Sequence, residues 1–187
     1  AAAAYAGART MVTMKQVGLN VAADPLMSLA YVGVKGGMVV VVADDPGPIS
    51  SQTEQDTRTF ASYSKLPVFD PVSPEEAYEM IGDAFEISEK YSTPVLFRPT
   101  TRICHGCATI DLEERPEYPA PEGFIKDANR WVIFPRLSYQ NHKKIELERT
   151  PKIAEEFSSY RFNQIKGSGK KGIITGGISY EYVEEAL

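Results

Sequence analysis

The sequence predicts an α/β fold, with a mostly parallel β-sheet and flanking helices. Strand and helix signals alternate through roughly the first 110 residues, the order expected when a crossover helix follows each strand. The run 38–43 is continuously apolar and rich in valine, which is typical of a strand buried on both faces. Two Ser-x-x-Glu sequences, beginning at Ser51 and Ser73, are capping boxes and predict helix starts.

This first region divides into strands and helices in turn. Strands are expected at 10–14, 38–43, 67–69 and 95–97. Helices are expected at 20–31, at 51–63 and from Pro74 to before Pro94, where proline in the first turn costs no hydrogen bond. The helix at 20–31 has apolar residues at helical spacing, namely Val21, Leu26, Leu29 and Ala30. The last helix has one inward face, carrying Ala77, Met80, Ile81, Ala84, Phe85 and Ser88.

The rest of the chain is organised differently. The tract 111–141 is interpreted as an ordered arm or linker, because it is rich in proline and because Trp131–Phe134 need to be covered. Its prolines are Pro116, Pro119, Pro121 and Pro135. A polar helix is expected from Thr150 to about Tyr160, and Gly172–Gly177 predicts a new strand and turn, with Ser179 capping the next helix. We therefore expect an α/β domain over 1–112, an arm with a helix over 113–168, and the start of a second α/β domain over 169–187.

Charge and hydropathy exclude two classes of function. The chain carries 20 Lys and Arg against 25 Asp and Glu, a net charge of −5, without the basic block that nucleic-acid-binding proteins show. The longest apolar run, 38–43, is far shorter than the ~18–20 residues that span a bilayer. No signal-peptide pattern opens the chain, and two closely spaced cysteines give no disulfide framework, so a cytoplasmic location is expected. Both ends lie within uncapped helical patterns, which favours a fragment of a longer chain.

Three segments that follow predicted strands, all expected to be loops, hold the candidate functional residues. They are 15–20, 44–48 and 98–105, and together they supply amides, carboxylates, two arginines and a histidine. The carboxyl ends of parallel strands meet at one edge of a sheet, where ligands of such folds bind. The alternative is that these are ordinary polar loop residues. Buried charge at Lys15 or Asp44 would be harder to explain in that way, because unpaired buried charge is costly.

The sequence Cys104-His105-Gly106-Cys107 has the spacing of metal and redox motifs. A zinc site needs four ligands, and only His142 remains as a further Cys or His. A redox pair normally lies at a helix N-terminus, whereas this pair follows a strand, so two ordinary cysteines are favoured. The turn Gly176–Gly177 lacks both complete phosphate-binding patterns, GxGxxG and GxxxxGK[ST], and a plain tight turn is favoured there.

One long stretch and several shorter ones resemble a known family. The long stretch is 6–25, Ala-Gly-Ala-Arg-Thr-Met-Val-Thr-Met-Lys-Gln-Val-Gly-Leu-Asn-Val-Ala-Ala-Asp-Pro. It resembles the alpha subunits of the indolepyruvate:ferredoxin oxidoreductases, thiamine-diphosphate enzymes of the 2-oxoacid:ferredoxin oxidoreductase class. The likeness continues at 36–48, 50–58, 98–105 and 167–180, and it is weak between about Asp111 and Glu148.

The resemblance implies oxidative decarboxylation of aryl-pyruvates such as indolepyruvate. Family members form an acyl thioester with coenzyme A and pass electrons through iron–sulfur clusters to ferredoxin, together with a partner beta subunit. The chain would be a truncated pyrimidine-binding domain, and the glutamate that activates the cofactor is expected upstream of Ala1. Thiamine diphosphate with Mg²⁺ and the clusters belong to the full enzyme. By itself the fragment is therefore predicted to hold no cofactor and to be inactive.

The resemblance also assigns roles within and beside the three segments. The residues implied to lie near the cofactor are Lys15, Gln16, Gly18, Asn20, Asp44 and Asp45. Gln52 and Gln55 are implied to lie near the substrate, and Arg102 with His105 where a basic pair could meet the 2-oxoacid carboxylate. For Arg102, a salt bridge that ties the arm down is equally favoured. Two alternatives stay open for the whole protein: an oxidoreductase for another 2-oxoacid, and a non-catalytic subunit-interaction domain built on the Trp131 arm and the surface tyrosines.

Overall fold

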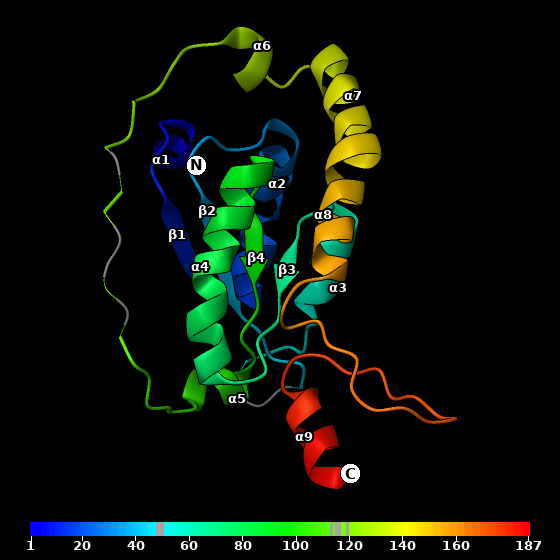
Figure 1. Ribbon diagram of the computed structural model, residues 1–187. Coiled ribbons are helices and arrows are strands. Elements are labelled where there is room, and N and C mark those ends of the chain that lie inside the picture. Colours follow the sequence, from blue (N-terminus) through cyan, green and yellow to red (C-terminus); the bar gives the residue numbers. More distant parts are fainter. Residues whose placement is uncertain (48–50, 113, 115–116, 119) are drawn as a thin grey trace.

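The computed structural model describes residues 1–47, 51–112, 114, 117–118 and 120–187. The predictions that fall on Pro48, Pro116 and Pro119 lie outside this part of the chain. Within it, a parallel four-stranded sheet forms the centre, and helices cover both of its faces (Figure 1). The α/β class expected from the alternating signals is therefore confirmed.

The four expected strands are all present. They are β1 (Thr10–Lys15), β2 (Met38–Ala43), β3 (Val68–Phe69) and β4 (Val95–Phe97). Every pairing is parallel and the order is β1-β2-β4-β3. The register sets Lys15 opposite Ala43 and Val41 opposite Phe97, so β1, β2 and β4 end at the same edge of the sheet.

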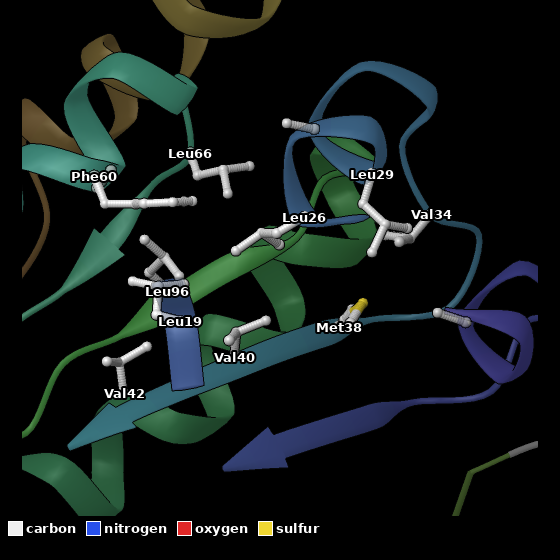
Figure 2. Close-up of a cluster of buried hydrophobic side chains, with 13 residues drawn as sticks. Leu19, Leu26, Leu29, Val34, Met38, Val40, Val42, Phe60, Leu66 and Leu96 are labelled. Atoms are coloured by element: carbon white, nitrogen blue, oxygen red, sulfur yellow. The ribbon is translucent and has the colours of Figure 1, made fainter. Parts of the chain in front are cut away.

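The two faces of the sheet bury separate apolar layers. Helices α2 (Gln16–Val32) and α3 (Thr57–Ser64) cover one face, where Leu19, Val42 and Leu96 belong to the buried cluster of Figure 2. Helix α4 (Pro74–Tyr91) covers the other face and packs on Val39, Val95 and Phe97. The valine run of β2 alternates between the two layers, which explains why it is apolar throughout.

Helix α4 confirms the second capping box. The Ser73 hydroxyl accepts a hydrogen bond from the Glu76 amide at 3.2 Å, while the Glu76 carboxylate accepts one from the Val72 amide at 3.3 Å. On the predicted inward face, Met80, Ala84 and Ser88 are buried, and the remaining members are partly buried.

Helix α2 begins at Gln16, so the expectation of a loop over 15–20 is wrong. Val17 and Gly18 are weak helix formers, and the sequence therefore underestimates this first turn. The fold favours it because it buries Gln16 and Leu19 completely. A Cβ at Gly18 would lie 2.8 Å from the Cβ of Met14, so glycine allows strand and helix to join directly. Val21, predicted to face inward, is 86% exposed.

Helix α3 begins at Thr57 rather than at Ser51, so the first capping box does not start a helix. The Asp56 side chain caps α3 by accepting from the Arg58 amide at 3.0 Å. The Ser51 hydroxyl instead donates to the Asp45 carboxylate, and the Gln55 amide donates to the Asp45 carbonyl oxygen at 3.2 Å. These tertiary bonds hold 51–55 against the end of β2 and outweigh the local helical signal.

Beyond the short helix α5 (Thr101–His105) the chain becomes an arm, which passes outside β1 in Figure 1. The remaining described helices are α1 (Ala2–Tyr5), α6 (Ala128–Trp131), α7 (Pro135–Lys144), α8 (Thr150–Ser158) and α9 (Ser179–Ala186). A π-helical turn, Ile145–Arg149, joins α7 to α8. The expected polar helix over 150–160 is thus confirmed, as the last part of a longer helix.

The expectation that Trp131–Phe134 of the arm are covered by other parts of the chain is only partly met. The Trp131 ring lies 4.7 Å from the ring of Tyr5. Val132, Ile133 and Phe134 are 48%, 47% and 42% exposed, so the prediction is wrong for them. The four-residue helix α6 ends at Trp131, and the extended backbone after it does not return these side chains to the body.

The expected strand within 172–177 is not formed. Ile173 is 63% exposed and Ile174 fully exposed, because neither finds a strand to pair with. Ser179 is the first residue of α9 and not its cap, which is Ile178. In the described ranges, none of the helices combines the length and the apolar character needed to cross a bilayer.

Candidate functional site

The carboxyl edge of the sheet gathers the three predicted segments. Asp44 follows β2 and pairs with Thr100 in a parallel bridge, while Lys15 ends β1 beside them. Helices α5 and α9 lie at this same end of the molecule (Figure 1). The expectation that these polar residues meet at one edge is therefore confirmed.

Asp45 is the centre of the first polar group. Its carboxylate lies 2.7 Å from the Lys15 ammonium and accepts hydrogen bonds from the hydroxyls of Ser51 and Thr101. Burial alone would raise the pKa of Asp45, but these three donors outweigh it and hold the pKa well below its usual value. The Asp45 side chain is fully buried and that of Lys15 is 37% exposed. A fixed carboxylate thus orients a surface ammonium.

Arg98 is the centre of the second polar group. Its Nε donates to Asp44 Oδ2 at 2.6 Å, and its Nη1 donates to both carboxylate oxygens of Asp70 at 3.1 Å. The backbone amide and the hydroxyl of Thr57 also donate to Asp44 Oδ2, at 2.9 and 3.0 Å. Burial raises the pKa of Asp70, although the guanidinium groups of Arg98 and Arg58 oppose the shift.

Sequence reasoning singled out Asp44 but assigned no role to Arg98, Asp70 or Thr57. One signal was available, because an arginine directly after the apolar strand 95–97 is well placed to enter the interior. A buried charge requires a partner of opposite charge, so a buried Arg98 predicts a buried aspartate beside it. The identity of that aspartate depends on the register and could not be read from the sequence.

A shallow, open pocket lies beside the first polar group. It is lined by Lys15, Val17, Ser51 and Gln52. Val17 is 44% exposed and presents an apolar surface between an ammonium, a hydroxyl and a carboxamide. The described lining of this pocket thus combines one apolar side chain with three polar ones.

The other predicted site residues lie at different depths. Gln16 is fully buried, and its Nε2 donates to the Thr53 carbonyl oxygen at 2.9 Å. Gly18 and Asn20 belong to α2, where Asn20 is exposed. Gln55 is half-buried next to Asp45.

Arg102 and His105 are both exposed on α5, and their spacing of three residues sets them on one face of that helix. The Arg102 guanidinium lies 5.6 Å from the centre of the Tyr182 ring on α9. Among the described residues, Arg102 thus contacts α9, and no salt bridge joins it to the described part of the arm, which the alternative interpretation had named.

The two cysteines are free, and they lie at and beyond the C-terminus of α5 rather than at a helix N-terminus. Partial burial raises the pKa of the Cys104 thiol, which donates weakly to the Pro99 carbonyl oxygen at 3.8 Å. Over the part of the chain that the structure describes, no three His, Cys, Asp or Glu side chains are grouped so that they could hold a metal ion.

A parallel sheet with a charged carboxyl edge and an adjoining pocket defines a ligand-binding α/β domain. Residues 1–163 match the family described as "Pyruvate flavodoxin/ferredoxin oxidoreductase, thiamine diP-bdg". The chain belongs to this family of thiamine-diphosphate-binding domains.

Curated relatives extend the likeness to the whole chain. It is 48% identical to indolepyruvate oxidoreductase subunit IorA of Pyrococcus abyssi, over 99% of this chain and 30% of the relative. It is 47% identical to the subunit of the same name from Thermococcus kodakarensis, over 100% of this chain and 30% of the relative. The subunit of that name from Methanothermobacter thermautotrophicus is 40% identical, over 100% and 31%. The chain thus spans under a third of the length of these relatives. No solved structure matches it.

Proposed function

We propose that this chain is part of a thiamine-diphosphate-dependent oxidoreductase subunit that decarboxylates aryl-pyruvates such as indolepyruvate. The observation that carries the proposal is the identity of 40–48% to subunits named indolepyruvate oxidoreductase over 99–100% of this chain. The domain division at 112 and 168 belongs to the same proposal.

The proposal includes parts that lie outside this chain. We propose a partner beta subunit, coenzyme A as acyl acceptor, and iron–sulfur clusters that pass electrons to ferredoxin in the cytoplasm. Two cysteines cannot supply the four thiolates of a cluster, so the clusters belong to other parts of the enzyme. The glutamate that activates the cofactor is proposed to precede Ala1, and the isolated chain is expected to be inactive.

The residues of the pocket fit one part of thiamine diphosphate. Val17 offers an apolar surface to a flat ring, and Lys15 with Gln52 offers polar groups to the edge of that ring. A diphosphate with Mg²⁺ needs an open group of oxygen ligands. The Asp44 and Asp45 side chains are fully buried, so neither carboxylate is open to a diphosphate from solvent, and we assign the pyrimidine end, and not the diphosphate end, to this chain.

The chemistry is divided between the cofactor and this chain. When bound, thiamine diphosphate supplies the carbon nucleophile and the electron sink for decarboxylation. The Lys15 ammonium, held in place by Asp45, attracts the anionic 2-oxoacid to the pocket. Arg102 and His105 are proposed to meet the substrate carboxylate, and Gln55 is proposed to support the loop that carries Gln52.

The direct test uses the full parent subunit together with its partner subunit. Anaerobic, coenzyme A-dependent reduction of an electron acceptor is measured with indolepyruvate, phenylpyruvate, pyruvate and 2-oxoglutarate, each with and without thiamine diphosphate. We expect cofactor-dependent turnover that prefers the aryl acids. Preference for pyruvate or 2-oxoglutarate would favour the related oxidoreductase for another 2-oxoacid. No turnover in a preparation with intact clusters would favour the subunit-interaction domain.

A matched pair of variants tests the pocket. Lys15→Ala is expected to lower kcat/KM by about 10–100-fold, the usual effect of losing one charge-assisted contact. Lys65→Ala is the control, because within the described residues the Lys65 ammonium forms its ion pair with Glu146, at 3.7 Å in the π-helical turn, and does not line the pocket. Equal kinetics for the two variants would remove Lys15 from the binding site.

A further inference from the structure

Three buried oxygen atoms at the carboxyl edge have no hydrogen-bond partner within the described residues. They are Gln16 Oε1, Asp44 Oδ1 and Thr100 Oγ1. Gln16 and Asp44 are fully buried, and Thr100 is 4% exposed. An unsatisfied buried polar atom costs about 1–3 kcal/mol, so three together require an explanation.

The register makes these three residues neighbours. Lys15 pairs with Ala43, which sets Gln16 beside Asp44, and Asp44 pairs directly with Thr100. Gln16 begins α2 directly after β1, and its side chain bonds at Thr53 while that of Asp44 bonds at Thr57, so both side chains face the segment 53–57. Thr100 lies beside Asp44 on the neighbouring strand end, about 4.8 Å away. Val42, two residues before Asp44, and Leu19, three residues after Gln16, belong to the apolar cluster of Figure 2.

The surrounding bonds fix what these atoms can accept. Asp44 Oδ2 accepts three hydrogen bonds, one from Arg98 and two from the amide and hydroxyl of Thr57, whereas Oδ1 accepts none. The carboxamide of Gln16 is oriented by the bond from its Nε2 to Thr53, so its Oε1 faces away from that contact as an acceptor. Arg98 Nη2 also lacks a hydrogen bond, but it lies 3.5 Å from Asp56 and is electrostatically paired.

The charges of the two polar groups leave a negative excess. The linked carboxylates are Asp44, Asp45, Asp56 and Asp70, and the linked cations are Lys15, Arg58 and Arg98. Counted as fully charged, these four carboxylates exceed the three cations by one negative charge, and the Asp44 and Asp45 side chains among them are fully buried. A single positive charge on the ligand would balance it.

We propose that the oxygens of Gln16, Asp44 and Thr100 bind a monovalent alkali cation, Na⁺ or K⁺. Carboxylate, carboxamide and hydroxyl oxygens are ligands for hard cations, and one carboxylate with one surplus charge matches a monovalent ion rather than a divalent one. The ion ties the ends of β1, β2 and β4 together. It thereby stabilises the edge from which Lys15 and Asp45 project.

Thermal unfolding of the full chain tests the proposal. The midpoint Tm is measured in potassium, sodium and tetramethylammonium chloride at equal ionic strength, so that general screening is the same. A cation that binds only the folded state is expected to raise Tm in a saturable way, by about 3–6 °C at ten times its Kd. Identical Tm values in the three salts would overturn the proposal.

Thr100→Val and Thr93→Val form a matched pair of variants. Thr93 is also fully buried with an unpartnered hydroxyl, but it precedes β4, whereas Thr100 follows it. Thr100→Val is expected to abolish the cation-dependent rise in Tm, and Thr93→Val to keep it. A rise that persists in Thr100→Val would contradict the assignment.

A crystallographic measurement on the unaltered protein is independent of variant folding. Crystals soaked in thallous acetate are expected to show an anomalous peak in contact with the oxygens of Gln16, Asp44 and Thr100. A map without that peak would reject the site even if Tm responded to salt.

Discussion

Replacing Arg98 with methionine tests whether the second polar group is a structural requirement. The Arg98 side chain is 3% exposed and that of Asp44 is fully buried, with Nε and Oδ2 2.6 Å apart. Asp70, 15% exposed, loses its closest cation in the same variant. Methionine keeps most of the volume of arginine, so the change removes charge and hydrogen bonds with little loss of packing.

The expected magnitude follows from the burial of Asp44. Breaking a buried ion pair by removing one partner usually costs about 3–5 kcal/mol, because the other charge is left without compensation. For a chain of this length each kcal/mol shifts Tm by about 2–4 °C, which gives a decrease of about 6–20 °C. The backbone amide and hydroxyl of Thr57 remain bonded to Asp44, which favours the lower part of that range.

Urea-induced unfolding, followed by circular dichroism, measures the loss of free energy of unfolding. Arg58→Met is the control, because the Arg58 side chain is 48% exposed and its pair with Asp56 should contribute at most about 1 kcal/mol. The double variant Asp44→Leu with Arg98→Met is expected to recover part of the stability, since it leaves no unpaired charge at Asp44. If Arg98→Met cost no more than Arg58→Met, the buried pair would not be a requirement of the fold.

Three further predictions concern stability. Gly33→Ala should lower the free energy of unfolding by more than about 2 kcal/mol, because φ is +80° and a Cβ would lie 2.4 Å from the Ser92 carbonyl oxygen. Gly82→Ala, in an open part of α4, should raise the free energy of unfolding by about 0.5–1 kcal/mol. Thermal melts that rank the two variants otherwise would refute this. Ser73→Ala should cost about 1 kcal/mol by removing the cap of α4, and an unchanged urea midpoint would contradict it. The pKa of Asp45 is lowered in the folded state, so its stabilisation is present above the unfolded pKa of ~3.9 and is lost as pH falls below it. At neutral pH, Asp45→Asn should therefore be less stable than the unaltered chain by about 1–3 kcal/mol, and this difference should shrink below about pH 4. A difference in stability that stays constant with pH would count against the ion pair.

Local signals predicted helices only where tertiary contacts did not compete. Ser73 and Ser51 begin the same Ser-x-x-Glu pattern, yet only Ser73 caps a helix. The Ser51 hydroxyl binds Asp45 instead, and this bond depends on where β2 ends in space. The opposite error occurred at Gln16, where burial of the side chain extends a helix into residues that by themselves favour a loop.

The location of the candidate site could be predicted from the sequence, but the contacts between its residues could not. Polar segments after apolar strands indicated the carboxyl edge, and Lys15, Asp44 and Asp45 do meet there. The partners of these charges, Arg98 and Thr101 among them, come from β4 and α5, far along the chain. Propensity and periodicity describe near neighbours in sequence and hold no information about such pairs.

The sequence by itself determined the parallel α/β class, the strands, the long helix α4 and the family, because periodic burial and contiguous motifs are local properties. Only the tertiary structure showed which buried charges are paired and that the unpartnered oxygens of Asp44 and Thr100 belong to directly paired residues. The physical reason is that register fixes these neighbours. A shift of one residue in the pairing of a strand would turn the side chains of that strand to the other face of the sheet.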